Sequence, residues 1–151
     1  MSGVHGSGPV VFAYDGSDLA KQGIEEAGRL LEAGCEALVV TVWQPFDVGF
    51  LPVGGMQFDA AQIADVRAAA AQTAAAGAAH AEAAGFRARS AEVERSPIWK
   101  GIAELADEHD ARLIVLGSHG RSGLAGVFVG SVTSAVAAHS RRSVLIVHRG
   151  S

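Results

Sequence analysis

The chain has 151 residues and a formal net charge of −4 at pH 7, a size typical of one domain that buries about two-thirds of its unfolded surface. An acidic chain lacks the basic face that nucleic-acid-binding proteins usually present, so nucleic acid is excluded as the main partner. The single cysteine, Cys35, excludes an internal disulfide and fits a reducing compartment. We also expect neither a signal peptide nor a membrane-spanning segment, because no apolar run has the required length. The sequence therefore predicts a cytoplasmic protein.

The amino-terminal third predicts a strand, a helix and a second strand. Residues 1–8 are polar and are expected to form a disordered lead, with the domain over residues 9–149. The apolar run 10–14 predicts the first strand. Ser17 or Asp18 can cap the following helix, because their side-chain oxygens accept from free N–H groups of its first turn. Its apolar face runs at helical spacing to Leu30 and Leu31, Gly34 is expected to end it, and residues 37–43 predict the second strand.

The middle of the chain holds one long irregular segment. Residues 44–58 combine glycine, proline and apolar residues in one long loop, which suits a lid, a dimer contact or a disordered connection. Residues 59–84 are alanine-rich and predict a long helix, interrupted or strained at Gly77. Residues 86–93 then predict the third strand.

The last third alternates helices and strands again. Ser96 and Pro97 predict a helix start, with the serine as cap and the proline at the first helical position. Residues 112–116 and 143–148 predict the fourth and fifth strands, with a helix over 132–139 between them. Strands that are apolar on both faces and separated by helices predict an open, parallel, Rossmann-like α/β sheet of five strands with helices on both faces.

The glycine-rich segment 117–131 is the strongest functional signal. It joins a buried strand to a helix start, and glycines there allow backbone amides to face an anion. Asp15 follows the first strand in a similar way. Ligands of such sheets bind beyond the carboxyl ends of the strands, so the ends of strands one and four are expected to form one site.

The spacing Gly117-x2-Gly120-x9-Gly130-Ser131 resembles the nucleotide-binding signature of the universal stress protein family, in its ATP-binding branch. The early Asp15-Gly-Ser and the Val-Thr-Val42 ending of the second strand fall where that family has them. The resemblance extends over residues 9–149. It implies the strand order 3-2-1-4-5 and a homodimer. Two residues depart from the family pattern: Tyr14 is bulkier than usual, and Ser143 stands where proline is common.

The resemblance also implies a role for each site residue. Asp15 would bind the ribose, the main chain of Val42 would contact the adenine, and Arg121 would add a charge-assisted contact. Mg²⁺ would be held only through the nucleotide phosphates. The helix dipole after Gly130 favours an anion at that place. The implied nucleotide-binding set is Ala13, Asp15, Val42, Gly117, Gly120, Arg121, Gly130, Ser131, Val132 and Thr133.

The sequence offers a phosphate-binding loop without catalytic machinery. It has no P-loop lysine motif, no nucleophile elbow, and no metal-ligand spacing among its histidines and Cys35. We therefore expect an ATP-binding regulatory protein of the stress-response type, with no catalytic residue and at most slow ATP hydrolysis. One alternative is a slow adenine nucleotide hydrolase in which His119 or Asp15 activates water. Another is a dimeric interaction protein that binds cyclic AMP or AMP, or whose nucleotide site is vestigial.

Dimerisation has its own signal in the sequence. Residues 144–147 form a short, strongly apolar strand at the end of the chain. An edge strand of this kind exposes backbone hydrogen-bonding groups unless another strand covers it. Pairing with a symmetry mate through Val144–Val147 would cover it across a two-fold axis.

Overall fold

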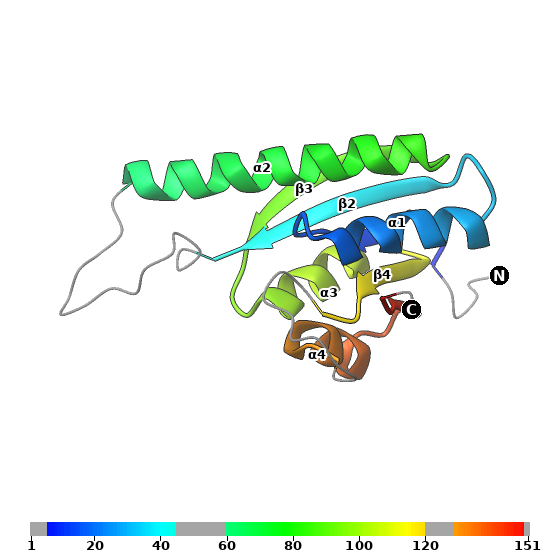
Figure 1. Ribbon diagram of the computed structural model, residues 1–151. Coiled ribbons are helices and arrows are strands. Elements are labelled where there is room, and N and C mark those ends of the chain that lie inside the picture. The colour runs from blue at the N-terminus through cyan, green and yellow to red at the C-terminus, as the bar shows by residue number, and fades with distance from the viewer. Residues whose placement is uncertain (1–5, 45–59, 120–128, 150–151) are drawn as a thin grey trace.

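The computed structural model describes residues 6–44, 60–119 and 129–149. Residues 45–58 of the predicted loop and most of the predicted glycine loop therefore lie outside the described residues. Strands and helices alternate along the chain (Figure 1). The elements are β1 (Val10–Ala13), α1 (Asp18–Leu30), β2 (Glu36–Trp43), α2 (Ala60–Ala83), β3 (Arg87–Glu94), α3 (Ile98–Glu108), β4 (Leu113–Gly117), α4 (Ser131–His139) and β5 (Val144–Val147).

The five strands form one parallel sheet in the order β3-β2-β1-β4-β5. This confirms the predicted fold class and the strand order that the family resemblance implied. The order reverses between β1 and β4, because β1 leads outward to β2 and β3 while β4 leads to β5. A parallel sheet needs such crossover helices, and they cover both of its faces.

Side chains of alternating residues fill two separate cores. Phe12 and Val39 pack with Ile24 of α1 on one face of the sheet. Val11 and Leu38, their immediate neighbours in the chain, belong to the other core, which includes residues of α3 and α4. The alternation follows from the two-residue period of a strand. Helices α1 and α2 therefore cover one face and α3 and α4 the other, as the ribbon shows (Figure 1).

Helix α2 is continuous through Gly77, so the predicted interruption is wrong. A Cβ atom at this position would lie 2.6 Å from Cδ1 of Tyr14 and 2.7 Å from Cγ1 of Val39. Glycine is needed because the helix passes directly over the tyrosine ring. Tyr14 is only 5 % exposed, and its burial raises the pKa of the phenol above its usual value. The bulk of Tyr14 is thus accommodated under α2.

Some predicted helix ends differ from the observed ones. Ser17 caps α1 as expected, and its hydroxyl oxygen accepts from the amide of Ala20. The α3 cap is Pro97, whose extended backbone (ψ 161°) places it outside the helix, so the predicted Ser96 cap is wrong. Leu30 was expected on the buried face of α1 but is 61 % exposed, because it is the last helical residue and lies beyond the sheet. Gly34, with φ of +89°, lies in the turn that follows α1.

Residues 6–8 are anchored to the domain, in contrast to the predicted disordered lead. The amide of Gly8 donates to the carbonyl of Asp110 at 2.8 Å, and the amide and hydroxyl of Ser7 donate to the carboxylate of Asp110. Arg112 donates to the carbonyl of Gly8 at 2.9 Å. Arg142 binds both Asp107 and Asp110 at 2.9 Å. These contacts hold the segment before β1 against the α3–β4 turn.

The two edges of the sheet carry different side chains. The edge strand β3 reads Arg-Ala-Arg-Ser-Ala-Glu-Val-Glu and is largely exposed. The opposite edge strand β5 reads Val-Leu-Ile-Val and is half-buried or buried. Charged side chains discourage the pairing of an exposed edge with another chain, whereas an apolar edge permits it.

Candidate functional site

A crevice opens where β1 and β4 separate at their carboxyl ends. The last residues paired between them are Phe12 and Val115. Beyond that point each strand bonds to its outer neighbour instead. The amide of Tyr14 donates to the carbonyl of Val40 in β2, and the amide of Ser118 donates to the carbonyl of Val147 in β5. The divergence leaves a cleft of about 560 Å³ at the place where strand order reverses.

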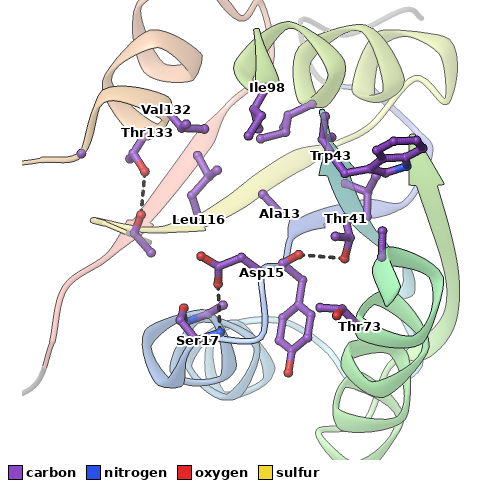
Figure 2. Close-up of a pocket in the computed structure, with 18 of the residues that line it drawn as sticks. Ala13, Asp15, Ser17, Thr41, Trp43, Thr73, Ile98, Leu116, Val132 and Thr133 are labelled. Carbon is purple, nitrogen blue, oxygen red and sulfur yellow. Dashed lines mark hydrogen bonds between the residues drawn. The ribbon is translucent and has the colours of Figure 1, made fainter. Parts of the chain in front are cut away.

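Eight of the ten predicted site residues line this cleft, and several are labelled in Figure 2. The structure thus brings together residues that are more than one hundred positions apart in the chain. Gly120 and Arg121 lie outside the described residues. The eight are Ala13, Asp15, Val42, Gly117, Gly130, Ser131, Val132 and Thr133.

Asp15 stands at the mouth of the cleft, directly after β1. One of its carboxylate oxygens accepts from the amide of Ser17 at 2.9 Å (Figure 2). This local bond fixes the turn between β1 and α1 in the manner of an Asx turn. On the adjacent strand, the hydroxyl of Thr41 donates to the carbonyl of Tyr14 at 2.8 Å. β2 therefore holds the carbonyl of Tyr14 in place, and Asp15 is the next residue in the chain.

The amino end of α4 contributes backbone donors to the cleft. The N-cap, Gly130, has no side chain that could accept a hydrogen bond from the first turn. The first-turn amides of Ser131, Val132 and Thr133 have no acceptor within the helix. The first turn also contains no acidic residue. A helix end of this kind has a partial positive charge and attracts an anion.

The two described glycines of the signature serve close packing. A Cβ at Gly117 would lie 2.9 Å from Cγ of Leu19 in α1, and one at Gly130 would lie 3.3 Å from Cα of His119. The amide of Gly130 donates to the carbonyl of Ser118 at 2.6 Å, so it is already engaged in this arrangement. Gly130 thus allows the chain before α4 to pass close to His119. The amides that follow it belong to the first turn of α4.

The hydroxyl of Thr133 already has a partner in the backbone. It donates to the carbonyl of Gly117 at 2.7 Å (Figure 2), and Thr133 is only 4 % exposed. A hydroxyl has one proton to donate, and here that proton is directed at the backbone. Thr133 can offer its amide to a phosphate, but its hydroxyl holds the end of β4.

Sequence reasoning missed one wall of the cleft. This wall combines Trp43 at the end of β2 with residues of α2. The indole nitrogen of Trp43 donates to the carboxylate of Glu92, and the guanidinium of Arg67 lies 5.7 Å from the centre of its ring. The position of Trp43 after Val42 could have indicated this wall, whereas the alanine-rich helix gave no signal. The α2 residues that line the wall are Val66, Ala69, Ala70 and Thr73.

His119 also lines the cleft. Its Nδ1 lies 3.1 Å from the hydroxyl of the buried Ser118. Its Nε2 is buried and has no hydrogen-bond partner among the described residues. Within residues 6–44, 60–119 and 129–149, no group of three or more His, Cys, Asp or Glu side chains could hold a metal ion. In that same part of the chain, none of the helices has the length and hydropathy to span a bilayer.

The fold and the crevice define the class of protein. A doubly wound parallel sheet with a cleft at its switch point, next to an uncapped helix start, is an α/β domain of the Rossmann-like type. The profile of the Universal stress protein family matches residues 7–148. The chain belongs to the universal stress protein family.

Individual relatives agree with this assignment. Universal stress protein Sll1388 of Synechocystis sp. is 30 % identical, over 94 % of this chain and 98 % of that protein. Universal stress protein Rv2005c of Mycobacterium tuberculosis is 34 % identical over 95 % of this chain. The chain spans only 46 % of the length of that relative. Among solved structures, a universal stress protein in complex with cAMP has a TM-score of 0.64 at 29 % identity, with 95 % of this chain and 98 % of that chain covered.

Proposed function

We propose that the protein binds an adenine nucleotide in the β1/β4 crevice and acts as a cytoplasmic regulatory protein of the stress-response type, with ATP as the nucleotide. One observation carries this proposal: the first turn of α4 faces the same cleft as Asp15. Backbone donors suit a phosphate, and a carboxylate suits ribose hydroxyls. The cAMP-bound relative supports the adenine nucleotide class.

The proposed pose follows the geometry of the cleft. Asp15 binds the ribose, and the phosphates lie against the amides of Ser131, Val132 and Thr133. The base lies near the main chain of Val42, between apolar side chains such as Ile98 and Leu116. Mg²⁺ accompanies the phosphates in this proposal, because hard cations prefer phosphate oxygens and water.

A regulatory role accounts for the site better than turnover does. Phosphoryl transfer to water needs a group that orients the attacking water. One Asp15 oxygen accepts from Ser17, and His119 Nδ1 lies against Ser118. Both contacts hold these side chains to their own loops. Steady hydrolysis that His119→Ala or Asp15→Ala abolishes, with binding retained, would instead favour the slow hydrolase.

Calorimetry on nucleotide-free protein tests the proposal. We expect ATP to bind, and AMP and cyclic AMP serve as the competing ligands. Ser131 is the first residue of α4, so Ser131→Pro removes its amide donor while the helix start is retained. This variant should weaken ATP binding about fivefold to tenfold. Ser131→Ala keeps the amide and is the matched control. Negligible affinity of the wild type for all three nucleotides would refute the proposal.

We further propose a homodimer through β5. This strand is the apolar edge of the sheet, and a two-fold axis beside it would pair Val144–Val147 of two copies. Light scattering at micromolar concentration should give twice the chain mass. Leu145→Lys places a charge on the half-buried edge and should yield monomers. A monomeric wild type would contradict the proposed dimer without affecting the nucleotide proposal.

A further inference from the structure

Two threonine hydroxyls act at the point where β1 and β4 separate. Thr41 of β2 donates to the carbonyl of Tyr14 at 2.8 Å. Thr133 of α4 donates to the carbonyl of Gly117 at 2.7 Å. Each threonine thus binds the end of a strand to which it does not belong. Figure 2 shows the two bonds on opposite sides of the cleft.

The register of the sheet relates these two carbonyls to each other. The last paired residues of β1 and β4 are Phe12 and Val115. Two residues further along each strand, the same register brings Tyr14 opposite Gly117. These are the residues whose carbonyls the threonines hold.

The amide and the carbonyl of one strand residue point to the same side of the strand. The amide of Tyr14 bonds to β2, so its carbonyl also faces β2, and Thr41 holds the end of β1 on that strand. The amide of Ser118 bonds to β5, so the preceding carbonyl of Gly117 faces β1, and Thr133 replaces the bond that a continued ladder would give it.

A buried carbonyl without a partner costs free energy comparable to a lost hydrogen bond. The separation of β1 from β4 would carry this cost at the carbonyl of Gly117, and the hydroxyl of Thr133 removes it. The amides of Tyr14 and Ser118 point outward and bond to Val40 and Val147. The carbonyl of Tyr14 also points outward and accepts from Thr41. All four groups therefore have partners within the protein.

We propose that Thr41 and Thr133 are positioning residues that fix where the β1–β4 ladder ends and so keep the nucleotide crevice open before binding. This inference rests on the proposed nucleotide function, which supplies the ligand. A preformed cleft spares the ligand the free energy of separating the strands. The inference also gives the hydroxyl of Thr133 a role separate from the phosphate contact proposed for its amide.

Isosteric variants test the inference. Thr41→Val and Thr133→Val remove the hydroxyls but retain the branched shape and the backbone amides. Each should weaken binding about tenfold, and by the same factor for AMP and ATP, because the whole cleft is affected. Thr41→Ser and Thr133→Ser should restore most of the affinity. Ser134→Ala on α4 is the control, since this exposed hydroxyl lies against the carbonyl of Val129 at 3.5 Å and is not among the described residues that line the cleft. If a valine variant does not fold, the alanine variant at that position replaces it.

A second measurement needs no ligand. Amide hydrogen exchange at Asp15 and Ser118 should change in the valine variants of the nucleotide-free protein and return to wild-type rates in the serine variants. Valine variants with unchanged exchange would overturn the inference. A loss of nucleotide affinity that occurs only in Thr133→Val, and is larger for ATP than for AMP, would also overturn the inference, because it would indicate direct contact between the hydroxyl and a phosphate. Exchange that responds as expected in a protein that binds no nucleotide would refute the proposed function and leave the inference intact.

Discussion

The two ends of the sheet are held together by different interactions. At the amino end, Arg142 joins Asp107 to Asp110, and Asp110 also binds Ser7. At the carboxyl end, the ends of β1 and β4 are held by hydroxyl-to-carbonyl and amide-to-carbonyl bonds to β2, β5 and α4. Asp15 is the single carboxylate among the described residues of the cleft wall.

This difference indicates how one sheet can be both stable and open. Ion pairs close the amino end and tie the chain before β1 to the α3–β4 turn. At the carboxyl ends of β1 and β4, short hydroxyl side chains and close packing satisfy the backbone, which leaves the cleft accessible, while the ion pairs of Arg67 with Glu92 and Glu94 lie further out, at the end of β3. We therefore expect substitutions at the amino end to lower stability without changing nucleotide affinity. The size of the stability loss should depend on salt and pH.

The largest effect should come from the close packing beside the cleft. Gly77→Leu forces a side chain into the ring of Tyr14 and into Val39, where even a Cβ would approach to 2.6 Å. We expect the free energy of unfolding to fall by about 3 kcal/mol or more. Urea denaturation measures this loss, which should be independent of salt. Ala76→Leu, on the exposed side of the same helix, is the control.

A second substitution identifies the cause of that loss. Tyr14→Ala in the Gly77→Leu background provides space for the new side chain. The double variant should be less destabilised than the sum of the two single changes, because neighbouring residues are not additive. Strict additivity would mean that the ring of Tyr14 is not what requires glycine at position 77.

A smaller effect is expected at the amino end. Arg142→Met removes the hydrogen bonds to Asp107 and Asp110 and should lower the free energy of unfolding by about 1–2 kcal/mol. High salt should reduce the difference from wild type. Arg29→Met breaks an exposed pair with Glu26 one helical turn away and should cost below about 0.5 kcal/mol. A changed nucleotide affinity in Arg142→Met would contradict the expectation that the amino end affects stability alone.

The smallest effect is a pH dependence at Asp110. The amide of Ser7, followed by the hydrogen bond from Arg142, lowers the pKa of this carboxyl below its usual value. A lowered folded-state pKa means that the contribution to stability is complete above the unfolded pKa of about 3.9. It is lost as the pH falls through the folded-state pKa. The stability difference between wild type and Asp110→Asn should therefore shrink in acid, as urea titrations from pH 6 to pH 3 can show. Glu108→Gln, which removes a nearby exposed carboxylate, should show no comparable change.

The sequence predicted the elements well because their signals are local. Runs of valine, isoleucine and leucine between helical patterns indicated four of the five strands, whereas β3 contains a single valine and no such run. The strand order came from the family resemblance, since periodicity alone does not specify which strands are neighbours. Eight predicted site residues meet in the cleft because each lies at or just beyond the carboxyl end of a strand, or at the start of α4.

What could not be predicted depends on contacts between distant residues. A glycine in an alanine-rich helix suggests a weak point, and only the fold shows that Gly77 lies on Tyr14. The partner of the Thr133 hydroxyl, the carbonyl of Gly117, depends on how α4 is placed against β4. Ser7 and Gly8 were predicted to be disordered because their partner, Asp110, lies about one hundred residues away in the sequence.

The charged edge strand β3 limits what the proposed pairing through β5 can build. Two copies joined at β5 would form one extended sheet with a β3 strand at each outer margin. Those margins carry arginine and glutamate side chains that oppose the addition of another strand. Association would stop at the pair and could not continue into a fibre by the same contact.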